Sequence, residues 1–165
     1  MLAGVVVSAC LAVVLPLKTL SARRDYHHRC PKDGIINGIV SERSGIRYDR
    51  AMRFVCRKGL LTFQCENSGY VTKLKESFDF RCPADTVLAG VSSRFDRLAR
   101  DRQFSFRCCK VRRSRTSTCR KSGWYGASDD IRLQVPPGWA VSELNSQYVG
   151  RGGGRSWRIE ICYLA

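Results

Sequence analysis

Residues 101–109 read Asp-Arg-Gln-Phe-Ser-Phe-Arg-Cys-Cys, and altered forms of this run occur at matching places in two other parts of the chain. One is Asp-Arg-Ala-Met-Arg-Phe-Val-Cys-Arg at 49–57, 52 residues earlier, and the other is Gly-Arg-Ser-Trp-Arg-Ile-Glu-Ile-Cys at 154–162, 53 residues later. A fixed period of this kind is the signature of an internal repeat. The run therefore predicts three copies of one structural unit.

Each copy alternates apolar and other side chains, which is typical of a strand with one buried face. Arg50, Arg102 and Arg155 fall on the apolar side of their copies. A buried guanidinium needs carboxylates or other acceptors, because leaving it unpaired is costly. We therefore predict that these three arginines are architectural, with ligand binding as the alternative.

The repeated unit is longer than the run itself and covers about 30–56, 82–109 and 135–162. The first two units begin with Cys-Pro and continue through a short apolar strand with a glycine bulge or close approach at Gly38 and Gly90. A polar loop then leads into the run that closes the unit. Aromatic and β-branched residues dominate, and no long 3.6-residue period occurs. The sequence predicts an all-β fold of three pseudo-repeats of antiparallel hairpins, for which trefoil-like closure is one arrangement.

The first 22 residues differ from the rest. An apolar run up to Leu17 is followed by the small residues Ser21 and Ala22. This order is typical of a secretory signal peptide, with an uncleaved anchor as the alternative. We expect residues 1–22 to be removed, which leaves a secreted, extracellular domain at 23–165.

Eight cysteines remain in that domain, an even number that indicates four disulfides in an exported chain. Two pairs share a separation of 26 positions, Cys30 with Cys56 and Cys82 with Cys108, so each is predicted to tie the start of a hairpin to its return strand. Val135 and Ile161 replace both members of the equivalent pair in the third repeat, and this joint loss supports the pairing.

The other four cysteines lie at equivalent positions in pairs. Quasi-symmetry favours Cys65 with Cys109 and Cys119 with Cys162, and the other two connectivities stay open because spacing cannot prove one. Zinc is the competing use of cysteine. Since there is no Cys-x-x-Cys pair and the only histidines are His27 and His28, we expect no metal and no cofactor. We expect no enzyme activity either, because no nucleophile motif occurs and the acids are scattered.

The expected mature domain has 28 basic and 14 acidic residues, a formal charge of +14. Outside the cell such a charge favours sulfated polysaccharides, acidic matrix proteins and cell surfaces over nucleic acid. The densest basic stretch is predicted to be a flexible loop that binds sulfated glycans with its guanidinium groups. Its candidate residues are Arg107, Lys110, Arg112, Arg113, Arg115, Arg120 and Lys121. A merely solvated loop, or a processing site between Arg112 and Arg115, is the alternative.

A second candidate surface is the loop with Arg94, Arg97 and Arg100, for which an ordinary solvated loop is the alternative. Equivalent loops lie near Arg47 and Arg151. If all three lie on one side, weak contacts with a repeating polymer add through multivalency.

The Asp-Arg-x-aromatic-x-aromatic-x-Cys-Cys run at 101–109, after a Cys-Pro start at 82–83, resembles the dermatopontin family over residues 23–165. The resemblance implies a secreted, disulfide-bonded matrix protein without enzymatic activity. Vertebrate members associate with dermatan-sulfate proteoglycan and collagen, support cell adhesion and modulate growth-factor signalling, and invertebrate relatives include haemagglutinins and shell-matrix proteins. This chain departs from the family pattern at Gly154, which replaces the acidic residue, and at Met52, which replaces an aromatic one.

Three functions follow as hypotheses. The first is a matrix or adhesion protein that binds dermatan-sulfate-like or heparin-like glycans, collagen or cell-surface receptors, without stable membrane insertion. The second is a lectin or haemagglutinin of innate defence with aromatic-lined sugar pockets. The third is a cationic antimicrobial protein. The sequence does not determine the oligomeric state.

Overall fold

The computed structural model describes residues 23–41, 49–150 and 154–165, and these form eleven strands in three antiparallel sheets. The predicted signal peptide and the loops around Arg47 and Arg151 lie outside the described residues. Within the described residues, no helix is long and apolar enough to cross a membrane. The all-β prediction is confirmed.

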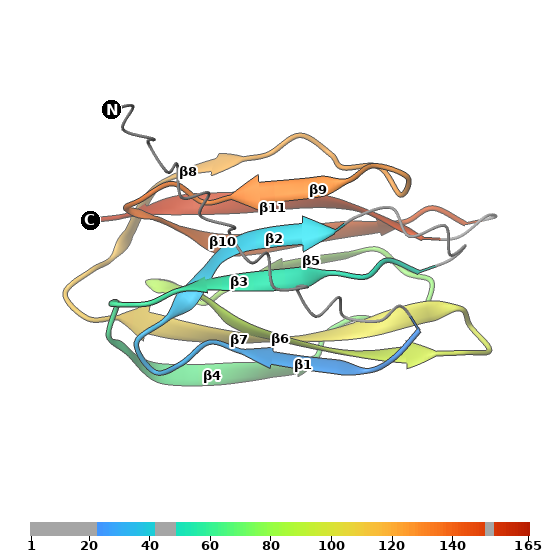
Figure 1. The fold of residues 1–165 in the computed structure, drawn as a ribbon, viewed down its shortest axis with the longest axis horizontal. Helices are drawn as coiled ribbons and strands as arrows, with labels where there is room; N and C mark the ends of the chain where they lie inside the picture. Colours follow the sequence, from blue (N-terminus) through green and yellow to red (C-terminus); the bar gives the residue numbers. More distant parts are fainter. Residues whose placement is uncertain (1–22, 42–48, 151–153) are drawn as a thin grey trace, which may run out of the picture.

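Each sheet is built around one hairpin from one repeat (Figure 1). The first sheet has the order β3 (Arg53–Arg57), β2 (Ile35–Ser41), β9 (Ile131–Gln134). The second has the order β1 (Tyr26–Arg29), β6 (Thr86–Asp96), β7 (Asp101–Val111), β4 (Thr62–Tyr70). The third has the order β5 (Phe78–Arg81), β10 (Trp139–Tyr148), β11 (Arg155–Leu164), β8 (Thr116–Lys121).

The three repeats exchange strands in a cycle. The strand before each hairpin pairs with the hairpin of another repeat: β1 with β6, β5 with β10, and β9 with β2. The last of these returns from the third repeat to the first. Strand-pairing hydrogen bonds do not join the three sheets to one another in the described chain, so trefoil-like closure is not observed. The cyclic exchange ties the repeats together instead.

The segments around Cys65 and Cys119, which lie between the repeat units in the sequence, are edge strands. β4 pairs with β7 and β8 pairs with β11, and each edge strand is fixed by a disulfide. The observed bridges are Cys30–Cys56, Cys82–Cys108, Cys65–Cys109 and Cys119–Cys162. These are the pairs that repeat spacing and quasi-symmetry favour.

Equivalent positions of the three repeats fill one core. Met52, Phe104 and Trp157 are equivalent and buried, and Phe104 packs edge-on against Trp157 with 5.1 Å between ring centroids. A further set of buried equivalents, Ile39, Val91 and Leu144, comes from the first strands of the three hairpins. The repeat therefore encodes a shared core that no single hairpin could bury alone.

Every hairpin has its register irregularity at the same place in its first strand. The irregularities lie before Gly38, Gly90 and Glu143, which are equivalent residues. A Cβ at Gly90 would lie 2.9 Å from the carbonyl oxygen of His28 on β1. The predicted bulge and close approach are both present, whereas the third repeat places a carboxylate where the other two have glycine.

Candidate functional site

The architectural arginines join one repeat to the next through buried carboxylate pairs. Arg102 of the second repeat donates from Nε to Asp49 Oδ1 at 2.6 Å and from Nη2 to Asp49 Oδ2 at 2.7 Å. Its Nη1 donates to the carbonyl of Arg24 at 2.9 Å. Both side chains are almost fully buried. The pair is bidentate, which is the strong geometry for a guanidinium and a carboxylate.

Arg155 repeats this arrangement one unit further along the chain. Its Nε donates to Asp101 Oδ1 at 2.8 Å, its Nη2 donates to Asp101 Oδ2 at 2.6 Å, and its Nη1 donates to the carbonyl of Glu76 at 2.8 Å. Thus the aspartate of each of the first two copies holds the arginine of the following copy. The sequence predicted the burial of these arginines but not that their partners lie in another repeat.

Arg50 breaks the pattern, because its partner in the cycle would be residue 154, which is glycine. Its Nη2 donates instead to the carbonyls of Gly126 at 2.8 Å and Ala127 at 3.1 Å. Burial lowers the pKa of Arg50, and the charges of Asp129 and Asp130 act in the opposite direction. All three arginines are held within the fold, but only two have a bidentate carboxylate.

The predicted basic loop is a short turn between β7 and β8. Ser114 donates its backbone N–H to the carbonyl of Val111 at 3.2 Å, and Arg113 has a φ of 60°. Arg115 exchanges two backbone hydrogen bonds with Ala165, at 2.8 and 2.9 Å. The turn is therefore fixed on the body of the protein rather than suspended as a long flexible loop.

Three cations of this turn are available for a ligand. Arg112, Arg113 and Arg115 are exposed, and their side chains make no hydrogen bond or ion pair with the described residues. The backbone N–H of Arg112 bonds the carbonyl of Leu61 at 2.8 Å. That contact brings the 58–62 segment and its exposed Lys58 to the same end of the molecule, and the backbone N–H of Thr62 bonds the carbonyl of Lys32 in turn.

The other four cations of the predicted basic group lie elsewhere. Arg107 and Lys110 are half-buried on β7, and burial followed by the charge of Arg29 lowers the pKa of Arg107. Arg120 lies over the Trp139 ring at 4.4 Å on β8. Lys121 is paired with Glu143 at 2.8 Å. Of the seven predicted cations, three therefore lie on the turn and four lie on the strands β7 and β8.

The second predicted loop lies at the other end of β7 (Figure 1). Arg94 is engaged, with its Nε donating to Gln103 Oε1 at 2.9 Å and its guanidinium 4.2 Å from the Tyr70 ring centroid. Arg97 and Arg100 line a cleft of about 470 Å³ together with Arg23 and Phe95. Arg23 comes from a different part of the sequence, so only the fold reveals this group.

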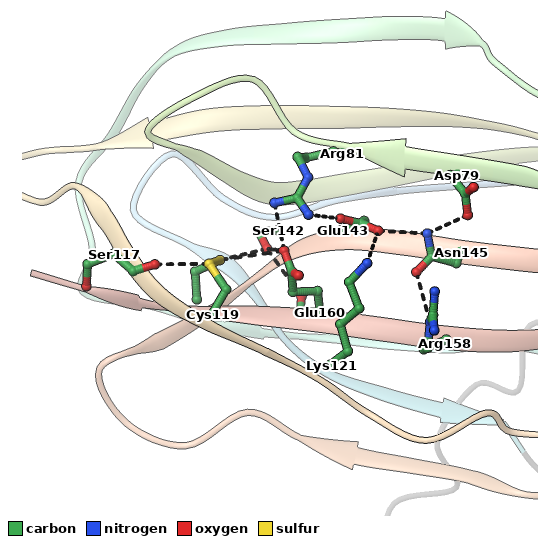
Figure 2. Close-up of polar contacts among 11 residues, drawn as sticks. Asp79, Arg81, Ser117, Cys119, Lys121, Ser142, Glu143, Asn145, Arg158 and Glu160 are labelled. Atoms are coloured by element: carbon green, nitrogen blue, oxygen red, sulfur yellow. Dashed lines mark hydrogen bonds and ion pairs between the residues drawn. A yellow bond between two sulfur atoms is a disulfide. The ribbon is translucent and has the colours of Figure 1, made fainter.

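The outer face of the β10–β11 sheet carries a network of buried acids and surface cations (Figure 2). Arg81 forms ion pairs with both Glu143 and Glu160, the latter at 2.8 Å. Asn145 donates to Glu143 at 2.8 Å. Burial alone would raise the pKa of Glu143, but the hydrogen bonds of Lys121 and Asn145 and the charges of Arg81 and Lys121 together lower it. Because the acids are neutralised in place, this face is not a free cation site.

Comparison with known proteins agrees with this architecture. The dermatopontin family model matches residues 20–165, which is most of the chain. The chain belongs to the dermatopontin family. Dermatopontin of Biomphalaria glabrata is 30% identical over 138 residues, covering 83% of this chain and 93% of that protein. No solved structure matches. Membership in the dermatopontin family, whose members are generally non-enzymatic, indicates an extracellular matrix protein, and four disulfides agree with an extracellular location.

Two groups of potential metal ligands occur in the described part of this dermatopontin-family chain. One joins His28 with Cys30 and Cys56, and the other joins Glu160 with Cys119 and Cys162. All four sulfur atoms belong to disulfides, so none is a thiolate that could bind a metal. The structure thus offers no thiolate ligand at either place.

Proposed function

We propose that the protein is an extracellular matrix and adhesion protein that binds sulfated glycosaminoglycans through the turn at 112–115. The observation that carries this proposal is the state of Arg112, Arg113 and Arg115, three exposed guanidinium groups that lack acceptors among the described residues. Lys58 and Lys32 extend the group at the same end. We call these five cations the basic end.

The chemistry of the basic end suits sulfate esters. A guanidinium presents a rigid fork of donors that matches the oxygens of sulfate or carboxylate, and several charges close together add their attraction to a polyanion. Because the turn is fixed by Leu61 and Ala165, little backbone ordering entropy opposes binding, and the main entropic cost is the ordering of the arginine side chains. Dermatan sulfate and heparin-like chains are the expected glycan class, and collagen and cell-surface receptors are the expected protein partners.

The test is retention of the variant Arg112→Ala, Arg113→Ala, Arg115→Ala on a heparin column. The matched control is Arg24→Ala, Lys73→Ala, Arg132→Ala, which removes the same charge from exposed positions elsewhere. We expect the turn variant to elute at clearly lower salt than the control, with both variants folded by circular dichroism. Equal elution of the two variants would show that net charge, not the turn, governs binding.

A neutral-sugar lectin is the second candidate, because partly exposed aromatic side chains lie on and next to the β10–β11 sheet. Trp139 packs edge-on against Tyr163 at 5.7 Å, and Trp124 is 40% exposed beneath the guanidinium of Arg158. Aromatic faces of this kind pack against sugar rings. Competition by a neutral saccharide, with little dependence on salt, would favour this function over charge-driven binding. Lysis of anionic vesicles would instead favour the antimicrobial function.

A further inference from the structure

The cyclic pairing of repeats leaves one position without its anion. Asp49 holds Arg102 and Asp101 holds Arg155, but Gly154 stands where the third carboxylate would hold Arg50. Three guanidinium groups and two carboxylates therefore gather where the repeats meet. This set carries one positive charge in excess.

Two buried hydrogen-bond donors at this place have no acceptor among the residues that the structure describes. They are Arg50 Nη1 and Trp157 Nε1, and each atom is shielded from solvent. Trp157 as a whole is only 2% exposed. Buried donors are nearly always satisfied in folded proteins, so two of them where the repeats meet call for an acceptor.

Both donors belong to residues that line the same small cavity. Its volume is about 20 Å³, and its lining includes Arg50, Arg102, Arg155, Gly154 and Trp157. This volume admits one particle of roughly the size of a water molecule. It excludes sulfate and larger organic anions.

We propose that this cavity binds one small monovalent anion of the halide class, with chloride as the physiological ligand. The anion would accept from the free donors of Arg50 and Trp157 and would occupy the place of the missing carboxylate. The charged groups that line the cavity sum to +1, and both lining aspartates already accept from Arg102 and Arg155, so the lining favours an anion over water. Asp129 and Asp130 offset part of the charge of Arg50, but they do not supply an acceptor to its Nη1.

The dependence of thermal stability on halide tests this proposal independently of glycan binding. A ligand that binds only the folded chain raises its stability. We expect the thermal midpoint in sodium chloride to exceed that in sodium gluconate at equal ionic strength by about 2–4 °C. Trp157→Phe removes one donor without changing the charge and keeps an aromatic ring, so the chloride effect should shrink in this variant.

The position of the anion is tested by soaking crystals in sodium bromide and measuring anomalous scattering. A bromide peak between Arg50 and Trp157 supports the proposal. Identical midpoints in the two salts together with no peak would overturn it, and the cavity would then hold water. A chloride effect that persists in full in Trp157→Phe would equally overturn it, because the anion would then act at the protein surface.

Discussion

Asp49 and Asp101 each neutralise an arginine that is more than 50 residues away in the sequence. A bidentate pair removed from water gains from Coulomb attraction but must first lose hydration, so its net contribution to stability is small. The loss of one partner strongly destabilises the fold, because the remaining charge stays buried and unpaired. These pairs therefore act mainly to fix which repeat docks on which.

We predict that Asp49→Asn lowers the free energy of unfolding by about 3–5 kcal/mol, because Arg102 would keep its charge in a buried site without a carboxylate. Glu66→Gln is the control, since it removes one negative charge from an exposed strand position. The control should change stability by about 0.5 kcal/mol or less. Denaturant unfolding under oxidising conditions measures both. Equal effects would mean that Arg102 finds other acceptors when Asp49 is lost.

At the scale of the strand, all three hairpins keep the bulge, although the residue that follows it differs between the repeats. β1 runs so close to β6 that Gly90 has no room for a side chain. In the third sheet the equivalent Glu143 pairs with Arg81 of β5 and sends its carboxylate into the outer network. One register irregularity thus serves two purposes, close approach in one sheet and a buried polar network in another.

We predict that Gly90→Ala destabilises the fold by about 1–3 kcal/mol, because its Cβ would lie 2.9 Å from the backbone oxygen of His28 and the two strands would have to separate. Gly123→Ala is the matched control, since its Cβ would meet no atom within 4 Å. Thermal unfolding compares the two variants. A control that is destabilised as much as Gly90→Ala would rule out strand crowding as the cause.

The repeat made the hairpins, their bulges and the core-facing rows predictable from the sequence. Equivalent residues such as Phe104 and Trp157 could be aligned because the period is nearly constant. The exchange of β1, β5 and β9 between repeats could not be predicted, because each is only four residues long and its partner is set by tertiary packing.

The candidate site was predictable only in part, for the same reason. Arg112, Arg113 and Arg115 are neighbours in the sequence and remain neighbours in the fold. The sequence alone could not show that Lys121, unlike these arginines, is held in an ion pair, because that requires knowing that β8 places it beside Glu143. Glu143 itself carries a signal that alignment of the repeats could have revealed, a charge at a position that is glycine in the other two copies.

At the scale of the whole molecule, cations occupy two separate ends. The turn at 112–115 follows the end of β7, and the cleft with Arg97 and Arg100 precedes its start. β7 has 11 residues, which span about 35 Å in extended conformation. If a glycan segment docks at the basic end as proposed, this separation leaves the cleft accessible to a second chain.

We predict that the protein bridges long heparin chains, which would appear as turbidity when protein and polymer are mixed near charge equivalence. The turn variant, with Arg112, Arg113 and Arg115 changed to alanine, and a cleft variant, Arg23→Ala with Arg97→Ala, should each keep measurable binding but lose turbidity, because bridging requires two occupied ends. Short heparin oligosaccharides should dissolve the wild-type aggregates, since they fill both ends without linking molecules. Turbidity that survives in both variants would show that the bridges arise from diffuse surface charge, and the idea of two separate binding ends would be wrong.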